Sequence, residues 1–169
     1  KIKVFPNSNA LRISQNRTLE KKFLNKLNIP IAEYYEINSK DQLELLKNIN
    51  NWPYILKTST FGYDGKGQVT VYSPEELTTA WNEFGRVPCV LEERMELDFE
   101  VSALVVRGHD DAVVAYPVSQ NIHRDGILHT STVPAPSLKP AQEKKMIEAA
   151  KALIRKIDYV GVLCVEFFV

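Results

Sequence analysis

The chain has 169 residues, of which 44% are hydrophobic and 25% charged, a composition typical of globular proteins. Basic and acidic residues both number 21, so the net charge is zero, and a neutral chain without a basic tract argues against nucleic-acid binding through phosphates. No apolar run reaches the ~18 residues of a membrane-spanning helix. Cys89 and Cys164 lack disulfide or zinc-site spacing, so both are predicted to be buried thiols in the reducing cytoplasm.

Hydrophobic periodicity and turn residues predict the elements of the first half of the chain. Pro30 ends the first helix, and Ser73 with Pro74 has the chemistry of a helix start. In chain order, the predicted elements are helix 17–27, strand 31–37, a helix from Ser39 or Asp41 to about Ile49, strand 54–57, strand 69–72 and helix 73–84.

The second half begins with consecutive strands and ends with a helix and a strand. The predicted elements are strands 89–92, 99–106 and 112–118, an extended polar segment 119–134, helix 140–157 and a buried strand from Gly161. Consecutive strands without intervening helices favour an α+β fold with two lobes over a doubly wound parallel sheet.

A glycine-rich segment, residues 62–68, forms the tip of the hairpin between the two middle strands. Three glycines let the backbone approach a ligand, and amide groups in such loops favour phosphate. The segment is neither a P-loop nor a dinucleotide fingerprint, because both glycine patterns are absent. Lys57 and Lys66 bring two ammonium groups near it. The alternative is an ordinary turn with two solvated lysines.

An acidic segment, residues 91–97, precedes Glu100 and has the character of a linker between two lobes. Its backbone could bind the edge of a base, and a carboxylate there could accept hydrogen bonds from ribose hydroxyls. The alternative is a solvated strand end. Asn121, His123 and Asp125 alternate along an extended segment, so they can line one wall of a cleft. A single histidine is more often structural.

Glu166 interrupts the apolar run of the last strand. A carboxylate in a buried strand is costly unless it is paired or bound to a metal, so Glu166 points to a cation site. A buried ion pair is the alternative.

Several motifs together resemble the ATP-grasp family and, within it, the N5-carboxyaminoimidazole ribonucleotide synthetases. They occur in family order over nearly the whole chain: GYDGKGQ at 62–68, EVS at 100–102, YP at 116–117, NIHRDGIL at 121–128, TS at 130–131, YVGV at 159–162 and EFF at 166–168. The resemblance implies an ATP-grasp fold with a glycine-rich hairpin lid. Residues 1–16 would be a linker from a missing N-terminal domain, 17–91 the small lid lobe, and 92–169 the start of an incomplete larger lobe.

The resemblance also implies roles for individual residues. Lys57 and Lys66 would act on the phosphates, His123 would lie near the nucleotide, and Glu166 would bind Mg²⁺. The other residues implied for the ATP site are Arg17, the loop residues Gly62, Tyr63, Asp64, Gly65, Gly67 and Gln68, the adenine-binding Glu92, Glu93, Arg94 and Met95, and the ribose-binding Glu100.

The implied reaction joins bicarbonate to 5-aminoimidazole ribonucleotide at the expense of ATP, in purine biosynthesis. The resemblance further implies a homodimeric parent enzyme without nucleic-acid or membrane partners. The residues that bind the acceptor are absent, so the chain alone is expected to be inactive. Two alternatives stay open: another ATP-grasp carboxylate–amine ligase, and a nucleotide-binding module without turnover.

Overall fold

The computed structural model describes residues 3–62, 66–124 and 126–169. The chain divides into two compact units: unit 1 comprises Lys1–Arg12 and Leu97–Val169, and unit 2 comprises Ile13–Glu96. In chain order, the elements are α1 (Ser8–Ser14), α2 (Arg17–Lys26), β1 (Tyr34–Ile37), α3 (Lys40–Leu46), β2 (Tyr54–Thr58), β3 (Gln68–Val71), α4 (Pro74–Glu83), β4 (Cys89–Glu93), β5 (Glu100–Arg107), β6 (Val113–Ala115), β7 (Ser119–Arg124), β8 (Ile127–Thr132), α5 (Pro140–Lys156) and β9 (Gly161–Phe168).

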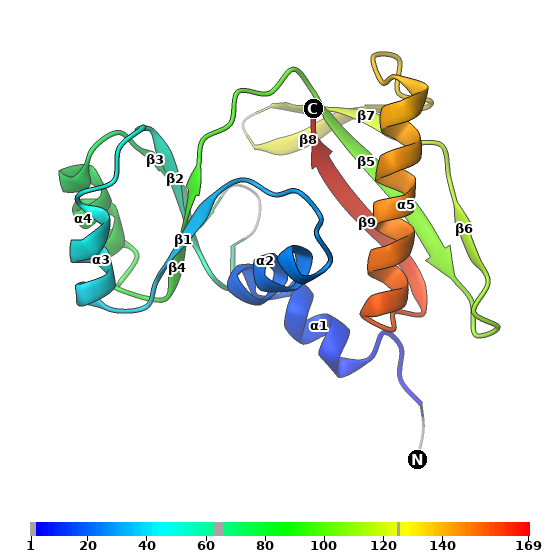
Figure 1. Cartoon of the computed structure of the whole chain (residues 1–169), viewed down its shortest axis with the longest axis horizontal. Helices are drawn as coiled ribbons and strands as arrows, with labels where there is room; N and C mark the ends of the chain where they lie inside the picture. The colour runs from blue at the N-terminus through cyan, green and yellow to red at the C-terminus, as the bar shows by residue number, and fades with distance from the viewer. Residues whose placement is uncertain (1–2, 63–65, 125) are drawn as a thin grey trace. The chain divides into compact units, whose positions relative to one another are not determined.

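Unit 2 is a four-stranded antiparallel sheet, in the order β1-β4-β2-β3, with helices on both faces (Figure 1). Helices α3 and α4 cover one face, and their buried side chains include Leu43, Leu77 and Trp81. The hydroxyls of Ser39 and Ser73 cap these two helices by accepting from backbone amides. The opposite face carries polar side chains, and α2 lies over it.

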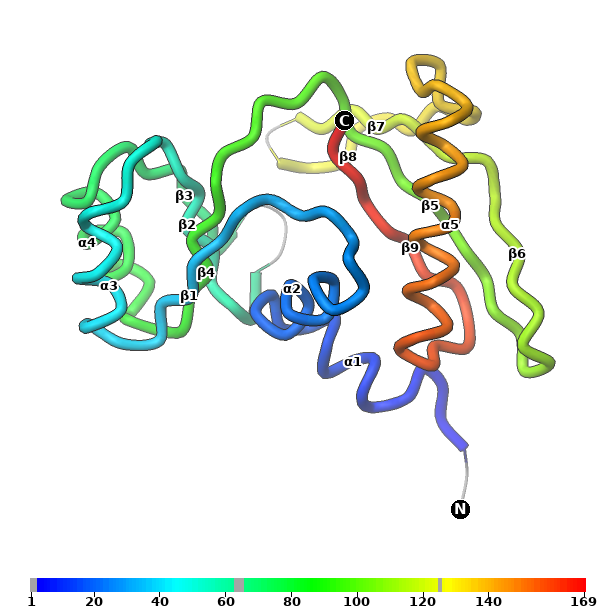
Figure 2. Tube along the Cα trace, in the orientation of Figure 1, coloured from blue at the N-terminus to red at the C-terminus, as the bar shows by residue number. Residues whose placement is uncertain are grey.

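Unit 1 is built around β5, which pairs with β9 along one edge and with β6 and β7 along the other. Helix α5 runs beside β5 and β9 (Figure 2). Alternate residues of β5, which include Val101 and Val105, point toward Ala150 and Ile154 of this helix and form the core. Glu100 and Ser102 therefore belong to the face that α5 does not cover.

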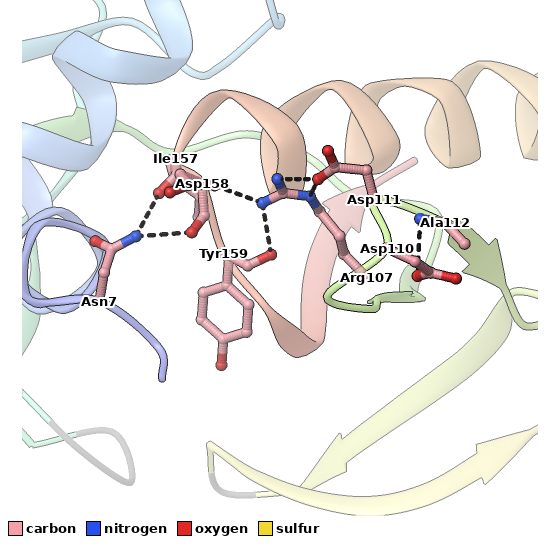
Figure 3. Close-up of polar contacts among 8 residues, drawn as sticks. All are labelled: Asn7, Arg107, Asp110, Asp111, Ala112, Ile157, Asp158 and Tyr159. Atoms are coloured by element: carbon pink, nitrogen blue, oxygen red, sulfur yellow. Dashed lines mark hydrogen bonds and ion pairs between the residues drawn. The ribbon is translucent and has the colours of Figure 1, made fainter. Parts of the chain in front are cut away.

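A polar cluster joins three connecting segments of unit 1 (Figure 3). The guanidinium of Arg107 donates to Asp111 and Asp158, and these two carboxylates raise the pKa of Arg107. The amide of Asn7 donates to the backbone carbonyls of Asp158 (2.7 Å) and Ile157 (3.3 Å). Carbonyls at the end of α5, which lack partners within the helix, are satisfied in this way.

The antiparallel α+β architecture is confirmed, and two local expectations differ from the structure. Residues 1–16 include helix α1, and Asn7 ties this segment to the end of α5. The extended segment 119–134 contains two paired strands, β7 and β8. Strand β6 spans fewer residues than the predicted 112–118, and Pro117 lacks the amide that a longer ladder would need.

The last strand, β9, was expected to be buried, but its residues alternate between half-buried and exposed. Helix α5 packs against only one of its faces, so Val162 and Phe168 on the other face are 58% and 56% exposed. Cys164 shares that face and is exposed, contrary to the prediction, whereas Cys89 is buried as predicted. Among the described residues, no helix is both long enough and apolar enough to cross a membrane.

Candidate functional site

The hairpin between β2 and β3 carries the glycine segment. Lys57, near the end of β2, lies opposite Gln68 at the start of β3. The amide of Thr58 donates to the carbonyl of Gly67 at 2.8 Å. Gly67 has a φ of +71°, and a Cβ atom there would lie 2.6 Å from Oγ1 of Thr58, so the position requires glycine. At the base of the hairpin, the backbone conformation and the contact with Thr58 therefore favour glycine at position 67.

The tip of this hairpin is described only in part. Tyr63, Asp64 and Gly65, which the resemblance assigns to the triphosphate, lie outside the described residues. Lys66 is exposed. Gly62, on the other side of the tip, contacts α2.

Arg17 occupies the first position of α2, where the local structure fixes its backbone. The side chain of Asn16 caps the helix by accepting from the amide of Leu19 at 3.0 Å, and the Arg17 amide donates to the carbonyl of Ser59 at 2.9 Å. A Cβ atom on Gly62 would lie 2.7 Å from Nη2 of Arg17. The absence of a side chain at Gly62 therefore lets the guanidinium lie against the start of the glycine segment.

An open cleft of about 500 Å³ lies beside Arg17 and is lined by Ser14, Gln15, Arg17, Ser59, Thr60, Phe61 and Gly62. The buried Nε of Arg17 has no hydrogen-bond partner among the residues that the structure describes. Phe61 is 94% exposed and has a φ of +62°, which is unfavourable for an aromatic residue. Phe61 was not among the residues expected from the sequence, because neither its exposure nor its backbone angle can be read there. The cleft combines an arginine with an exposed aromatic ring.

Lys57 is one member of a compact ion cluster on the face of the sheet that α2 covers. Its Nζ donates to Oε2 of Glu92 at 2.8 Å, while Oε1 of Glu92 lies 3.3 Å from Nζ of Lys21. The three side chains are only 17%, 10% and 11% exposed, respectively. Lys21 also lies 5.2 Å from the centre of the Tyr34 ring. Lys21 was not predicted as a site residue, because the sequence of its helix contains no motif that indicates ligand binding.

The chain leaves the sheet just after Glu93, within the segment that the resemblance assigns to adenine. The amide of Glu93 donates to the carbonyl of Glu33 at 2.9 Å, and that of Arg94 donates to the carbonyl of Pro53 at 3.4 Å. Met95 comes next and is 49% exposed. Backbone hydrogen bonds thus anchor the start of this segment, while an apolar side chain remains open to solvent.

Glu100 and His123 lie together in unit 1. Nδ1 of His123 is 2.9 Å from Oε2 of Glu100, and both side chains are partly exposed. Their strands are neighbours, because Glu100 of β5 pairs with Asn121 of β7. The chain shifts register between Ile122 and His123, a bulge that changes the simple alternation expected for this segment. Asp125, the third residue of that alternation, is outside the described residues.

Beside this pair lies a network of neutral polar groups, in which Ser102, Ser119 and Asn121 are buried and Ser131 is exposed. The amide of Asn121 donates to Oγ of Ser102 at 2.6 Å, and its carbonyl accepts from Ser131 at 2.9 Å. Ser119 donates to the backbone carbonyl of Ser102 at 3.4 Å. Because these groups satisfy one another on three strands, the network fixes the strands that carry Glu100 and His123.

Glu166 is exposed, which corrects the expectation of a buried carboxylate. It pairs across the strands with Ser102, on the sheet face that α5 leaves open. The described residues contain no group of three or more His, Cys, Asp or Glu side chains that could hold a metal ion. In the described residues, the exposure of Glu166 therefore does not supply the desolvation argument on which its prediction rested.

The predicted site residues fall into two groups. In unit 2, the structure brings Arg17 to Gly62 and Lys57 to Glu92. In unit 1, it brings Glu100 to His123.

Comparisons with known proteins show the family of the chain. The sequence matches the ATP-grasp domain family over residues 22–169. It is 38% identical over 167 residues to the N5-carboxyaminoimidazole ribonucleotide synthase of Pseudomonas aeruginosa, covering 99% of this chain and 46% of that protein. The chain spans about half the length of the curated relatives it matches.

Two crystal structures of carboxyaminoimidazole ribonucleotide synthase from Aspergillus clavatus are similar to the fold described above. The complex with ATP gives a TM-score of 0.89 at 30% identity and covers 99% of this chain and 44% of that one. The complex with ADP and 5-aminoimidazole ribonucleotide gives a TM-score of 0.86 at 27% identity, with the same coverage of 99% and 44%.

Proposed function

This chain belongs to the ATP-grasp family, and from that premise we propose that it forms the nucleotide-binding part of an N5-carboxyaminoimidazole ribonucleotide synthetase. The enzyme would use ATP and bicarbonate to carboxylate 5-aminoimidazole ribonucleotide, releasing ADP and phosphate, in purine biosynthesis. The observation that carries the proposal is the arrangement around the glycine hairpin. There, Arg17 lies against Gly62 with a buried Nε that has no hydrogen-bond partner among the described residues.

The proposed chemistry has two group-transfer steps. A bicarbonate oxygen forms a bond to the γ-phosphorus of ATP while the bond from that phosphorus to the bridging oxygen breaks, which gives carboxyphosphate and ADP. The exocyclic amine of the acceptor then attacks the carboxyl carbon, phosphate leaves, and the nitrogen loses a proton. In the first step, Lys57, Lys66, Arg17 and the hairpin amides would bind the phosphate oxygens and stabilise the charge on the transferring group.

The remaining residues would bind the nucleoside. The segment 92–95 would contact adenine, with Met95 offering an exposed apolar surface. Glu100 would accept hydrogen bonds from the ribose hydroxyls, and His123, whose Nδ1 is 2.9 Å from Oε2 of Glu100, would lie beside it. The network around Asn121 supports this placement, because it leaves little freedom to the strands that carry both residues.

Glu166 fits a role as a ligand of Mg²⁺. This ion commonly takes one or two carboxylates together with substrate phosphates, and an exposed single carboxylate suits such a shared site. When bound, the ion would neutralise phosphate charge.

The test is a phosphate-release assay on the full-length polypeptide that contains this chain. We expect release to require ATP, bicarbonate and 5-aminoimidazole ribonucleotide together. Release with a different carboxylate and amine would establish another ATP-grasp ligase, and ATP binding without release would establish a binding module. The proposal includes a cytoplasmic homodimer, which sedimentation of the same protein and fractionation of cells would test.

Lys57→Met tests the assigned phosphate contact. Loss of a pre-positioned charge at the transferring group is expected to lower kcat/KM for ATP by about 100-fold. Lys47→Met is the matched control, because Lys47 belongs to the same unit and pairs with Glu44 at the surface. Unchanged kinetics for Lys57→Met would remove this lysine from the site.

A further inference from the structure

Lys21 is a buried lysine to which the proposed function assigns no task. The whole residue is 9% exposed, and its side chain 11%. It lies on the face of α2 that is turned toward the sheet, one helical turn after Arg17. Lysine is rarely buried unless it is paired, and two cations four residues apart on a helix repel each other. Glu92 is the partner that compensates the burial of Lys21.

The carboxylate of the ion cluster is shared by two lysines. Glu92 offers one oxygen to Lys21 and the other to Lys57. A second carboxylate, Glu20, interacts electrostatically with both lysines and with Glu92, and desolvation raises its pKa. Lys21 is therefore a second partner of Glu92 and not a source of net positive charge.

The cluster also sets the energetic cost of separating Lys57 from Glu92. A buried carboxylate without a partner is strongly unfavourable, because burial removes the water that would otherwise solvate its charge. If Lys57 turned to a phosphate oxygen, Glu92 would still be paired with Lys21. The second lysine thus lowers the cost of breaking the bond between Lys57 and Glu92.

We propose that Lys21 is a positioning residue that holds Glu92 so that Lys57 is free to exchange this carboxylate for a nucleotide phosphate. The inference rests on the proposed function, since it takes the ligand of Lys57 to be a nucleoside polyphosphate. Lys21 itself acts through Glu92 and does not touch the ligand.

The alternative is that the ion pair of Lys21 and Glu92 only tethers α2 to the sheet. A tether contributes to stability in the same way whatever ligand is present. Under our proposal, the loss of Lys21 affects ligands with a polyphosphate and spares ligands without one. The two accounts therefore differ in the affinity for ATP relative to adenosine.

The experiment measures displacement of a fluorescent ATP analogue from the full-length protein by ATP and by adenosine. We expect Lys21→Met to weaken ATP binding by about tenfold, the effect of roughly one partly buried charge interaction, and to leave adenosine binding unchanged. Lys21→Arg, which keeps the charge, should restore most of the ATP affinity. Lys22→Met is the matched control, because Lys22 is the next residue of the same helix and forms its ion pair at the surface, with Glu36 of β1.

A second comparison isolates the route through Glu92. In a Glu92→Gln background Lys21 has no carboxylate at position 92 to hold, so adding Lys21→Met should cost no further ATP affinity. Equal ATP affinity in Lys21→Met and the unmodified protein, or equal losses for ATP and adenosine, would overturn the role of Lys21. Failure of the unmodified protein to bind ATP would instead overturn the proposed function.

Discussion

The two units hold their charged residues in different ways. In unit 2, Glu92 is shielded and engages two lysines, so this charge is already paired without a ligand. In unit 1, Glu166 is exposed and Glu100 is only partly covered, beside a network of neutral groups. Removing one partner of a buried ion pair is strongly destabilising because it leaves an uncompensated charge, whereas removing a solvated carboxylate costs little. The contrast predicts that substitutions in the two units differ in their effect on stability.

The largest expected effect comes from removing the shielded carboxylate. Glu92→Leu leaves two lysines without their partner, and breaking a buried pair in this way typically costs about 3–5 kcal/mol of unfolding free energy. Urea unfolding would measure the loss. Glu166→Gln, the exposed counterpart, should change stability by less than about 0.5 kcal/mol. Similar losses in the two variants would contradict the contrast between the units.

The neutral network of unit 1 predicts a smaller effect. Asn121→Ala leaves the buried hydroxyl of Ser102 without its partner, which should cost about 1–3 kcal/mol. Arg124→Ala, an exposed position on the same strand, serves as the control and should be nearly neutral. A loss below about 0.5 kcal/mol in Asn121→Ala would show that the network does not hold the strands together.

The smallest effect concerns the two thiols, which also lie in different units. Burial raises the pKa of Cys89 to about 11, so at pH 8 the exposed Cys164 should react with iodoacetamide while Cys89 stays unmodified. A raised pKa in the folded state means that the contribution of Cys89 to stability is complete below the reference pKa of 9.0 and is lost as pH rises toward 11. Mass spectrometry would locate the label. Rapid labelling of Cys89 in the folded protein would contradict its burial.

The sequence predicted the fold well where local chemistry determines it. Ser39 and Ser73 cap their helices, and the periodic stripe of α5 faces the core as expected. The motifs led to the ATP-grasp fold, which the family match and the similar structures support.

The prediction failed where tertiary contacts decide. The apolar run of β9 has the pattern of a strand covered on both faces, but α5 packs against only one face, so Glu166 is exposed. The pairing of Lys21 with Glu92 joins residues far apart in the sequence, and no local pattern encodes it. The positive φ of Phe61 likewise depends on the hairpin as a whole. For the candidate site, the sequence indicated which residues and motifs to consider. It did not indicate which side chains pair with one another or how exposed they are.

Hydrogen–deuterium exchange of the full-length protein, with and without ATP and Mg²⁺, tests the central claim most directly. The account predicts that ATP slows exchange in peptides covering residues 57–68 and 92–100, and that Lys57→Met weakens this protection. Peptides from α3 and α4, which form the opposite face of unit 2, should not change. Protection confined to α3 and α4, or no protection at saturating ATP, would contradict the assignment of the nucleotide site.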